Sequence, residues 1–249
     1  MFLLSYFSFK VFTSIEKSKN NYSVKLTDKI DPDIVLINIK DGDRAFIANL
    51  LLTIDSCKPI LIAIDAFFTD EKEQAQDSAL INAFSIVKND ILAYSLDSVG
   101  KPLKSNVKFT SLAGEEGLSI SEKVNGLSSN IIPLRVIDNK IYELFALKII
   151  KHWKPEFGHD IKPNQVIPIK FARTLEQFIY FDDLHKINNF CEYLRNKVVL
   201  LGYLGPSNED KQFTPIRIVK KYNDDQPDTY GLVIVANEIR TILEYEKKK

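Results

Sequence analysis

The sequence predicts an α/β fold of three layers, in which a mostly parallel central sheet carries helices on both of its faces. Apolar runs rich in β-branched residues recur along the chain, as in "DPDIVLINI" and "VVLLGYL". Their continuous apolar character is typical of strands that are buried on both faces. Segments with apolar residues at helical spacing alternate with these runs, and the connections are short. No internal repeat or long linker interrupts the pattern.

The elements are expected in a regular order along one domain. Strands are predicted over residues 31–39, 60–68, 90–96, 130–138, 166–172, 177–184 and 198–204. Helices are predicted over residues 44–58, 78–88, 142–154, 185–197 and 230–249. Residues 100–130 are polar and rich in Gly and Ser, which indicates a surface region or an insertion. We therefore expect a single sensor-like α/β domain over residues 30–249, with residues 1–29 as an N-terminal arm or helix on its core.

Particular residues justify the ends of these helices. Asp43 suits the N-cap of the first helix, and Asp77 suits the N-cap of the second, because a carboxylate accepts from free backbone amides. Lys58 precedes Pro59, and the residue before a proline is disfavoured in the α region, so the first helix ends there. Pro155 ends the third helix in the same way.

Charge and composition exclude several classes of function. Lys and Arg together number 33, as do Asp and Glu, so the chain has no overall basic field that would collect nucleic acid. No run approaches the ~20 apolar residues of a membrane-spanning helix. Cys57 and Cys191 are expected as two small buried side chains, and a single bridge between them is the alternative in an oxidising compartment.

Acidic residues follow the predicted strands. Asp41 follows the first strand, Asp65 closes the second, and Asp210 lies in the loop after residues 198–204. Ligands of open parallel sheets bind beyond the carboxyl ends of the strands, so we expect these acids on one rim. We predict a ligand-binding site there rather than a metal site, because metal sites show tighter spacing of acids and His.

Two further residues complete the predicted ligand-binding set. Arg135 interrupts an apolar strand, and such an Arg needs a carboxylate partner, for which Asp65 or Asp138 is expected, or an anion. Thr214 belongs to the loop that contains Asp210. The predicted ligand-binding residues are Asp41, Asp65, Arg135, Asp210 and Thr214.

The familiar catalytic motifs do not fit the chain. "GYLGPSNED" lacks the Gly-Lys-Ser/Thr of a phosphate loop, and Ser207 is not set in the G-x-S-x-G of a nucleophile elbow. None of His152, His159 and His185 has a second His or a carboxylate at ligand spacing. We predict no catalytic residue and no cofactor.

The order of several motifs resembles a known family over most of the chain, from about Ile34 to Leu243. "PILIAIDAFF" and "DSALINAF" resemble a strand that ends in Asp and an aromatic residue, followed by an Asp-headed helix. "LRNKVVLLGYLGPSNEDKQFTP" and "YGLVIVANEIRTIL" resemble a late strand with an Asp-to-Thr-Pro loop and a closing Gly-to-Ala-Asn helix. The family is the CHASE domain of type two, of the cyclase and histidine-kinase associated sensory extracellular group. Members commonly carry a His just before Ala-Asn, where this chain has Val235, and a role that depended on that His would be absent here.

The resemblance implies a non-catalytic, extracytoplasmic sensory domain of a membrane-anchored bacterial signalling protein. Its partners would be an unknown small-molecule or ion signal and an output domain across the membrane that this chain does not contain. Members are usually anchored by helices on both sides, so the chain is expected to be an excised ectodomain or a member without anchors. Two alternatives remain. One is a metal-dependent phosphoester hydrolase that uses the same acids, and the other is a scaffold that forms a homodimer through the N-terminal segment and the last helix.

Overall fold

The central sheet is almost entirely parallel. The computed structural model describes residues 24–221 and 225–248. The strand order is β11-β1-β12-β2-β3, and β3 also pairs with β5 in parallel and with β4 in antiparallel fashion. The strands are β1 (Ile34–Asn38), β2 (Leu61–Asp65), β3 (Asp90–Leu96), β4 (Pro102–Leu103), β5 (Glu115–Leu118), β11 (Ile179–Phe181) and β12 (Val198–Gly202). The late strand β12 therefore lies between β1 and β2, in the middle of the sheet.

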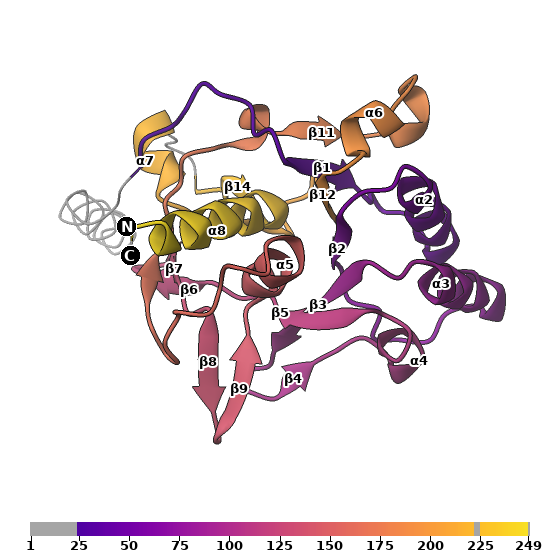
Figure 1. The fold of residues 1–249 in the computed structure, drawn as a ribbon, viewed down its shortest axis with the longest axis horizontal. Coiled ribbons are helices and arrows are strands. Elements are labelled where there is room, and N and C mark those ends of the chain that lie inside the picture. The colour runs from indigo at the N-terminus through magenta and orange to yellow at the C-terminus, as the bar shows by residue number, and fades with distance from the viewer. Residues whose placement is uncertain (1–23, 222–224, 249) are drawn as a thin grey trace, which may run out of the picture.

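Helices cover both faces of this sheet, which confirms the predicted three layers. Figure 1 shows α2 (Arg44–Ser56) and α3 (Gln74–Ile86) on one side of the strands, with α5 (Phe145–Trp153) and α8 (Gly231–Glu246) on the other. Alternate residues of each strand point to opposite faces. Side chains such as Val35 and Ile37 accordingly pack with α2 and α3, while those such as Ile34 and Leu36 pack with α5 and α8.

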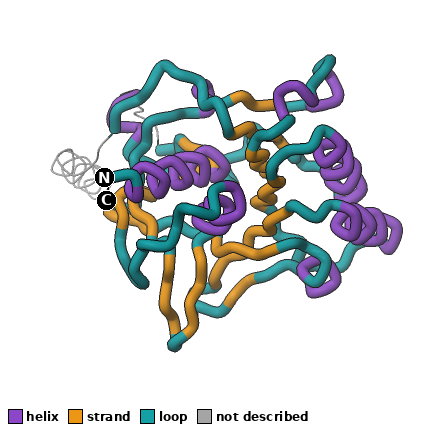
Figure 2. Tube along the Cα trace, viewed as in Figure 1, coloured by secondary structure: helices purple, strands orange, loops and turns teal. Residues whose placement is uncertain are grey.

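Smaller elements surround this core (Figure 2). The short helical segments are α4 (Val107–Thr110), η1 (Leu175–Gln177), η2 (Leu184–Lys186), α6 (Cys191–Leu194) and α7 (Ile216–Lys220). The strands outside the central sheet are β6 (Glu122–Val124), β7 (Leu127–Ile131), β8 (Leu134–Ile137), β9 (Lys140–Glu143), β10 (Ile167–Pro168), β13 (Lys211–Gln212) and β14 (Thr229–Tyr230). β8 and β9 form a hairpin that projects from the body of the domain (Figure 1).

The predicted strand over residues 130–138 is wrong, because the segment divides at Pro133. Its first residues complete β7, which pairs with β6 and β10, and its last residues form β8, which pairs with β9. Residues 100–130 are also more than a surface insertion. They contain β5, which extends the central sheet beside β3.

Two helix predictions are corrected by local backbone geometry. Within the segment predicted as a helix over residues 185–197, only Cys191–Leu194 is α-helical, and Asn189, at a positive φ of 56°, interrupts the segment before it. α3 begins at Gln74, so Asp77 lies inside its first turn and does not cap it. Asp77 instead pairs with Arg44 of α2 and with Lys108 of α4, whose Nζ lies 2.7 Å from its Oδ2. By contrast, Asp43 caps α2 as predicted and accepts a hydrogen bond of 2.8 Å from the Phe46 amide.

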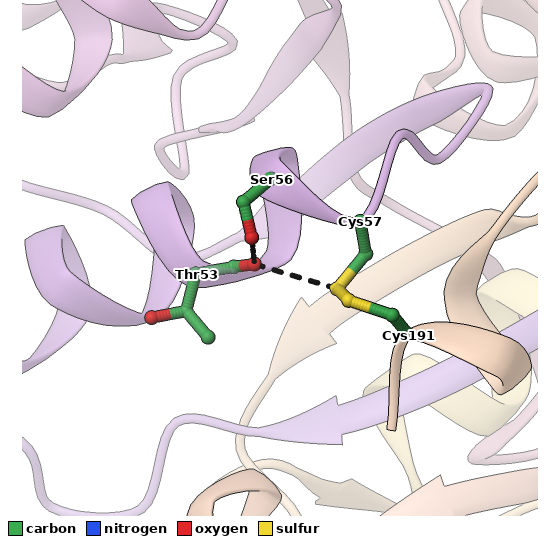
Figure 3. Close-up of a disulfide and its surroundings, with 4 residues drawn as sticks. All are labelled: Thr53, Ser56, Cys57 and Cys191. Carbon is green, nitrogen blue, oxygen red and sulfur yellow. Dashed lines mark hydrogen bonds between the residues drawn. A yellow bond between two sulfur atoms is a disulfide. The ribbon is translucent and has the colours of Figure 1, made fainter. Parts of the chain in front are cut away.

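The two cysteines form a disulfide, so the expectation of two separate buried side chains is wrong. Cys57 follows the last turn of α2 and Cys191 begins α6, and their Cα atoms lie 4.8 Å apart (Figure 3). The bond joins residues 134 positions apart in the sequence. It therefore ties the segment after the edge strand β11 to the layer formed by α2.

Part of the predicted N-terminal arm lies outside the described residues. Residues 1–23 are among those that the structure does not describe. Of the remainder, Val24 packs against the core, and the Thr27 amide donates a 2.8 Å hydrogen bond to the Ala172 carbonyl. The arm itself stays a prediction. None of the described helices has the length and apolar character needed to cross a membrane.

We expect the disulfide to contribute strongly to stability. Removing a bridge that closes a long loop costs roughly 2–5 kcal/mol, because the unfolded chain regains conformational freedom. Replacing both cysteines by Ser, or adding a reductant, should lower the free energy of unfolding measured in urea by that amount. An unchanged unfolding curve under reducing conditions would show that the bridge does not constrain the native protein.

Candidate functional site

A cavity of about 420 Å³ opens at the carboxyl edge of the central sheet. Residues that end or follow β1, β2, β3, β5 and β12 contribute to its wall, and α8 supplies one side. Its acidic residues are Asp41, Asp65, Glu209, Asp210 and Glu238. The structure thus brings Asp41, Asp65 and Asp210 together, which is the convergence expected from the ends of parallel strands.

The register of the central strands aligns their carboxyl ends. Asn38 of β1 lies opposite Gly202 of β12, which lies opposite Asp65 of β2. The Asn38 side chain is 3% exposed, and its Oδ1 accepts from the amides of Lys40 and Leu204 at 2.8 and 2.9 Å. The amide side chain therefore holds the residues that leave β1 and β12 side by side, next to Ile39 and Tyr203 of the cavity lining.

Two glycines allow α8 to approach this edge closely. A Cβ on Gly202 would lie 2.9 Å from Leu232 Cδ2, so a side chain there would push α8 away from β12. A Cβ on Gly231 would lie 2.9 Å from Asp210 Oδ1. The Gly231 amide also donates a 2.9 Å hydrogen bond to the Asp210 carbonyl. The first residue of α8 is therefore packed against Asp210.

Glu238 is the site residue that sequence reasoning missed. It lies on the same face of α8 as Gly231 and Val235, and all three line the cavity. Its side chain is 3% exposed, and no described residue forms a hydrogen bond or ion pair with its carboxyl group. The sequence signal that could have identified it is an acidic residue next to Asn237 within the mostly apolar stretch "GLVIVANEI", because charged residues are rarely buried without a partner.

Burial disfavours the ionisation of the deeper carboxyl groups of the cavity, and the charge of Asp65 adds to this effect at Asp210 and Glu238. Burial raises the pKa of Asp210 to about 7, the charge of Asp65 adds to the rise, and the Gly231 amide opposes it. Burial likewise raises the pKa of Glu238 to about 8, again with a contribution from Asp65. The pKa of Asp65 is also raised by burial, against the opposing effect of the Ser119 hydroxyl. The charge of Asp65 therefore raises the pKa values of both Asp210 and Glu238.

Arg135 and Thr214 lie outside the lining of this cavity. Arg135 sits on β8 and its Nη2 pairs with Glu122 of β6, so Asp65 and Asp138 are not its partners. Thr214 is buried, and its hydroxyl lies 2.8 Å from that of Thr229. Participation of Arg135 and Thr214 in ligand binding stays a prediction.

A cluster of acidic side chains could also bind a metal ion. Within the described ranges, no group of three or more His, Cys, Asp or Glu side chains is arranged so that it could hold one. Asp41 and Glu209 are exposed at the rim, whereas Asp65, Asp210 and Glu238 lie deeper. The cavity is therefore acidic throughout its depth.

The family model for the CHASE2 domain matches residues 31–249, which include every residue that lines the cavity. The chain belongs to the CHASE2 domain family. No curated protein and no solved structure matches it. CHASE2 domains are a family of sensory extracellular domains, which confirms the resemblance read from the ordered motifs. Val235, the position at which the family resemblance leads us to expect His, lines the cavity of this CHASE2 domain together with Glu238.

The raised pKa values predict that this CHASE2 domain loses stability as the pH rises. A carboxyl group whose pKa is higher in the folded state binds more protons there, so the free energy of unfolding falls as the pH rises through the interval between the two pKa values. For Glu238 that interval runs from its ordinary pKa of 4.5 to about 8. The slope reaches at most about 1.4 kcal/mol per pH unit for one group.

Chemical denaturation at a series of pH values measures this effect. Glu238→Gln should flatten the profile between about pH 5 and pH 8, because it removes one titrating carboxyl group. Glu244→Gln provides the matched control, since Glu244 lies on the same helix but pairs with Lys170 at the surface. If Glu238→Gln left the slope of the free energy of unfolding against pH unchanged, Glu238 would not be the buried group that titrates in this range.

Proposed function

We propose that this CHASE2 domain is a non-catalytic signal receiver that binds a small ligand in the cavity at the carboxyl edge of its sheet. The observation that carries the proposal is the cavity itself. Its volume of about 420 Å³ lies within the usual range of small-molecule sites, roughly 300–1,000 Å³. Polar groups from several strand ends and from α8 converge on it, as expected of a binding site in an open parallel sheet.

The domain is proposed to act on the extracytoplasmic, periplasmic side of a bacterial membrane. The disulfide between Cys57 and Cys191 supports this location, because such bonds persist in oxidising compartments and are rare in the cytosol. The whole signalling protein is proposed to connect this domain to membrane anchors and to an output domain across the membrane. Under this proposal the CHASE2 domain binds the signal, and the output domain produces the response.

Helix α8 is proposed to carry the response away from the cavity. Gly231, Val235 and Glu238 line the cavity, while the helix continues to Glu246, close to the end of the chain. Its 16 residues span about 24 Å at the rise of an α-helix. A ligand that presses on or pulls at the first two turns would thus displace the far end of a rigid element that packs on α5.

A thermal-shift screen of anions, sugars, amines and divalent ions tests the placement of the ligand. Any compound that raises the melting temperature should lose its effect in Asp65→Ala, because Asp65 lines the cavity. The same compound should keep its effect in Glu244→Ala, because Glu244 lies outside the cavity and pairs with Lys170. Shifts that survive Asp65→Ala would place the ligand elsewhere.

The phosphoester hydrolase is the alternative that the same acids support. Turnover of a generic phosphoester with Mg²⁺ or Mn²⁺, abolished by Asp65→Asn, would establish it in place of the sensor. Under the proposed function the wild-type protein and Asp65→Asn should give the same background rate. Homodimerisation through the N-terminal segment and the last helix stays a separate prediction, which a measurement of mass in solution decides.

A further inference from the structure

The walls of the cavity carry charge of one sign. Its lining includes five acidic side chains and no Lys, Arg or His. The nearby cations of Lys40 and Arg135 are engaged outside it, with Asp183 and Glu122 respectively. A ligand that enters this cavity therefore meets carboxyl groups without any compensating protein cation in the wall.

Glu238 gives a second and independent indication. A buried carboxyl group normally has a hydrogen-bond partner, because leaving it without one costs free energy. Glu238 is only 3% exposed and lines the cavity, and no described residue forms a hydrogen bond with its carboxyl group. The bonding capacity of this carboxyl group is thus left for something in the cavity.

We infer that the ligand is a small aliphatic amine, which places a protonated nitrogen between Glu238 and Asp65. This inference rests on the proposed function, since it names the class of molecule that the sensory cavity takes. An ammonium group is a donor in all its N–H bonds and carries the charge that the wall lacks. Charge-assisted hydrogen bonds to carboxylates are also the strong ones in proteins.

The remaining walls fit the carbon chain of such an amine. Ile39, Ala66, Ile120 and Ile234 line the cavity and offer apolar surface to methylene groups. Aromatic rings at Phe67 and Tyr203 can face a cation across their π-systems. The volume of about 420 Å³ also exceeds the need of a bare ion, since a water molecule takes about 30 Å³ of liquid.

A second nitrogen would find partners at the mouth of the cavity. Asp41 and Glu209 are exposed there, at a different depth from Glu238. Apolar residues lie in the same lining as these two acidic groups. A diamine with a short aliphatic spacer therefore matches the distribution of charge better than a single amine does.

Binding of an amine should be coupled to the release of protons. The titratable groups that face the cavity are Asp41, Asp65, Tyr203, Glu209, Asp210 and Glu238. Burial keeps Glu238 largely protonated and Asp210 partly protonated near neutral pH, with pKa values of about 8 and about 7. An ammonium group favours their ionised form and lowers both pKa values, so affinity should rise with pH until the amine itself loses its proton.

Isothermal titration of the whole chain with putrescine tests the inference. Butanediol and succinate serve as uncharged and anionic controls of the same chain length, and Mg²⁺ serves as the inorganic cation. Putrescine alone should bind. The observed heat should change with the ionisation enthalpy of the buffer, and the affinity should increase from about pH 6 to about pH 8.

Matched variants locate the bound amine. Glu238→Gln and Asp65→Asn should each weaken putrescine binding by about tenfold or more, which corresponds to roughly 1.4 kcal/mol. Glu244→Gln should leave it unchanged, because Glu244 lies on the same helix outside the cavity. Melting curves of the free variants show that each has folded, and Gln and Asn keep the size and shape of the side chains that they replace.

The outcomes separate this inference from the proposed function. Putrescine binding that is insensitive to both Glu238→Gln and Asp65→Asn would overturn the amine site. If succinate, butanediol or Mg²⁺ binds and depends on Asp65 while putrescine does not bind, the ligand class is wrong and the proposed function stands. Absence of putrescine binding at every pH tested would also overturn the inference, and the broader thermal-shift screen would then decide the proposed function.

Discussion

The candidate site depends on one constraint, the parallel register of the central strands. Asn38, Gly202 and Asp65 lie side by side across β1, β12 and β2, so the carboxyl ends of these strands leave the sheet at the same level. The buried side chain of Asn38 fixes the backbone that follows β1 and β12. Parallel strands buried on both faces require helices above and below. One of those helices, α8, forms the side of the cavity whose other walls come from the strand ends.

This arrangement makes ionisation of the buried carboxyl groups unfavourable. Asp65, Asp210 and Glu238 are drawn together by the sheet edge and by the close approach of α8, which Gly202 and Gly231 permit. Burial and mutual repulsion then oppose their ionisation. Natural proteins retain such unfavourable groups mainly where function needs them. A cavity whose buried carboxyl groups ionise more fully when a cation enters couples occupancy to a change in electrostatic energy, which suits a receiver of signals.

Much of the fold and part of the site could be predicted from the sequence. The apolar runs around Ile34 and Val198 identified strands because period and composition are local properties, and Asp43 identified a helix start for the same reason. Asp41, Asp65 and Asp210 followed from the rule for parallel strand ends. The partner of Arg135, the role of Asp77 and the Cys57–Cys191 bond depend on contacts between distant segments, which local patterns do not encode. Glu238 was missed because a lone acid on a helix usually faces solvent.

The central claim is that a buried Glu238 faces a cavity in which acids disfavour one another's ionisation. NMR of the side-chain carboxyl carbons, in protein labelled at glutamate, measures its ionisation directly, and the Glu238→Gln variant assigns the signal. The account predicts that Glu238 titrates near pH 8, where its pKa is placed by burial and by Asp65. It also predicts that Asp65→Asn moves the midpoint downward. A midpoint in the ordinary range of glutamate, about 4.3, would contradict the account.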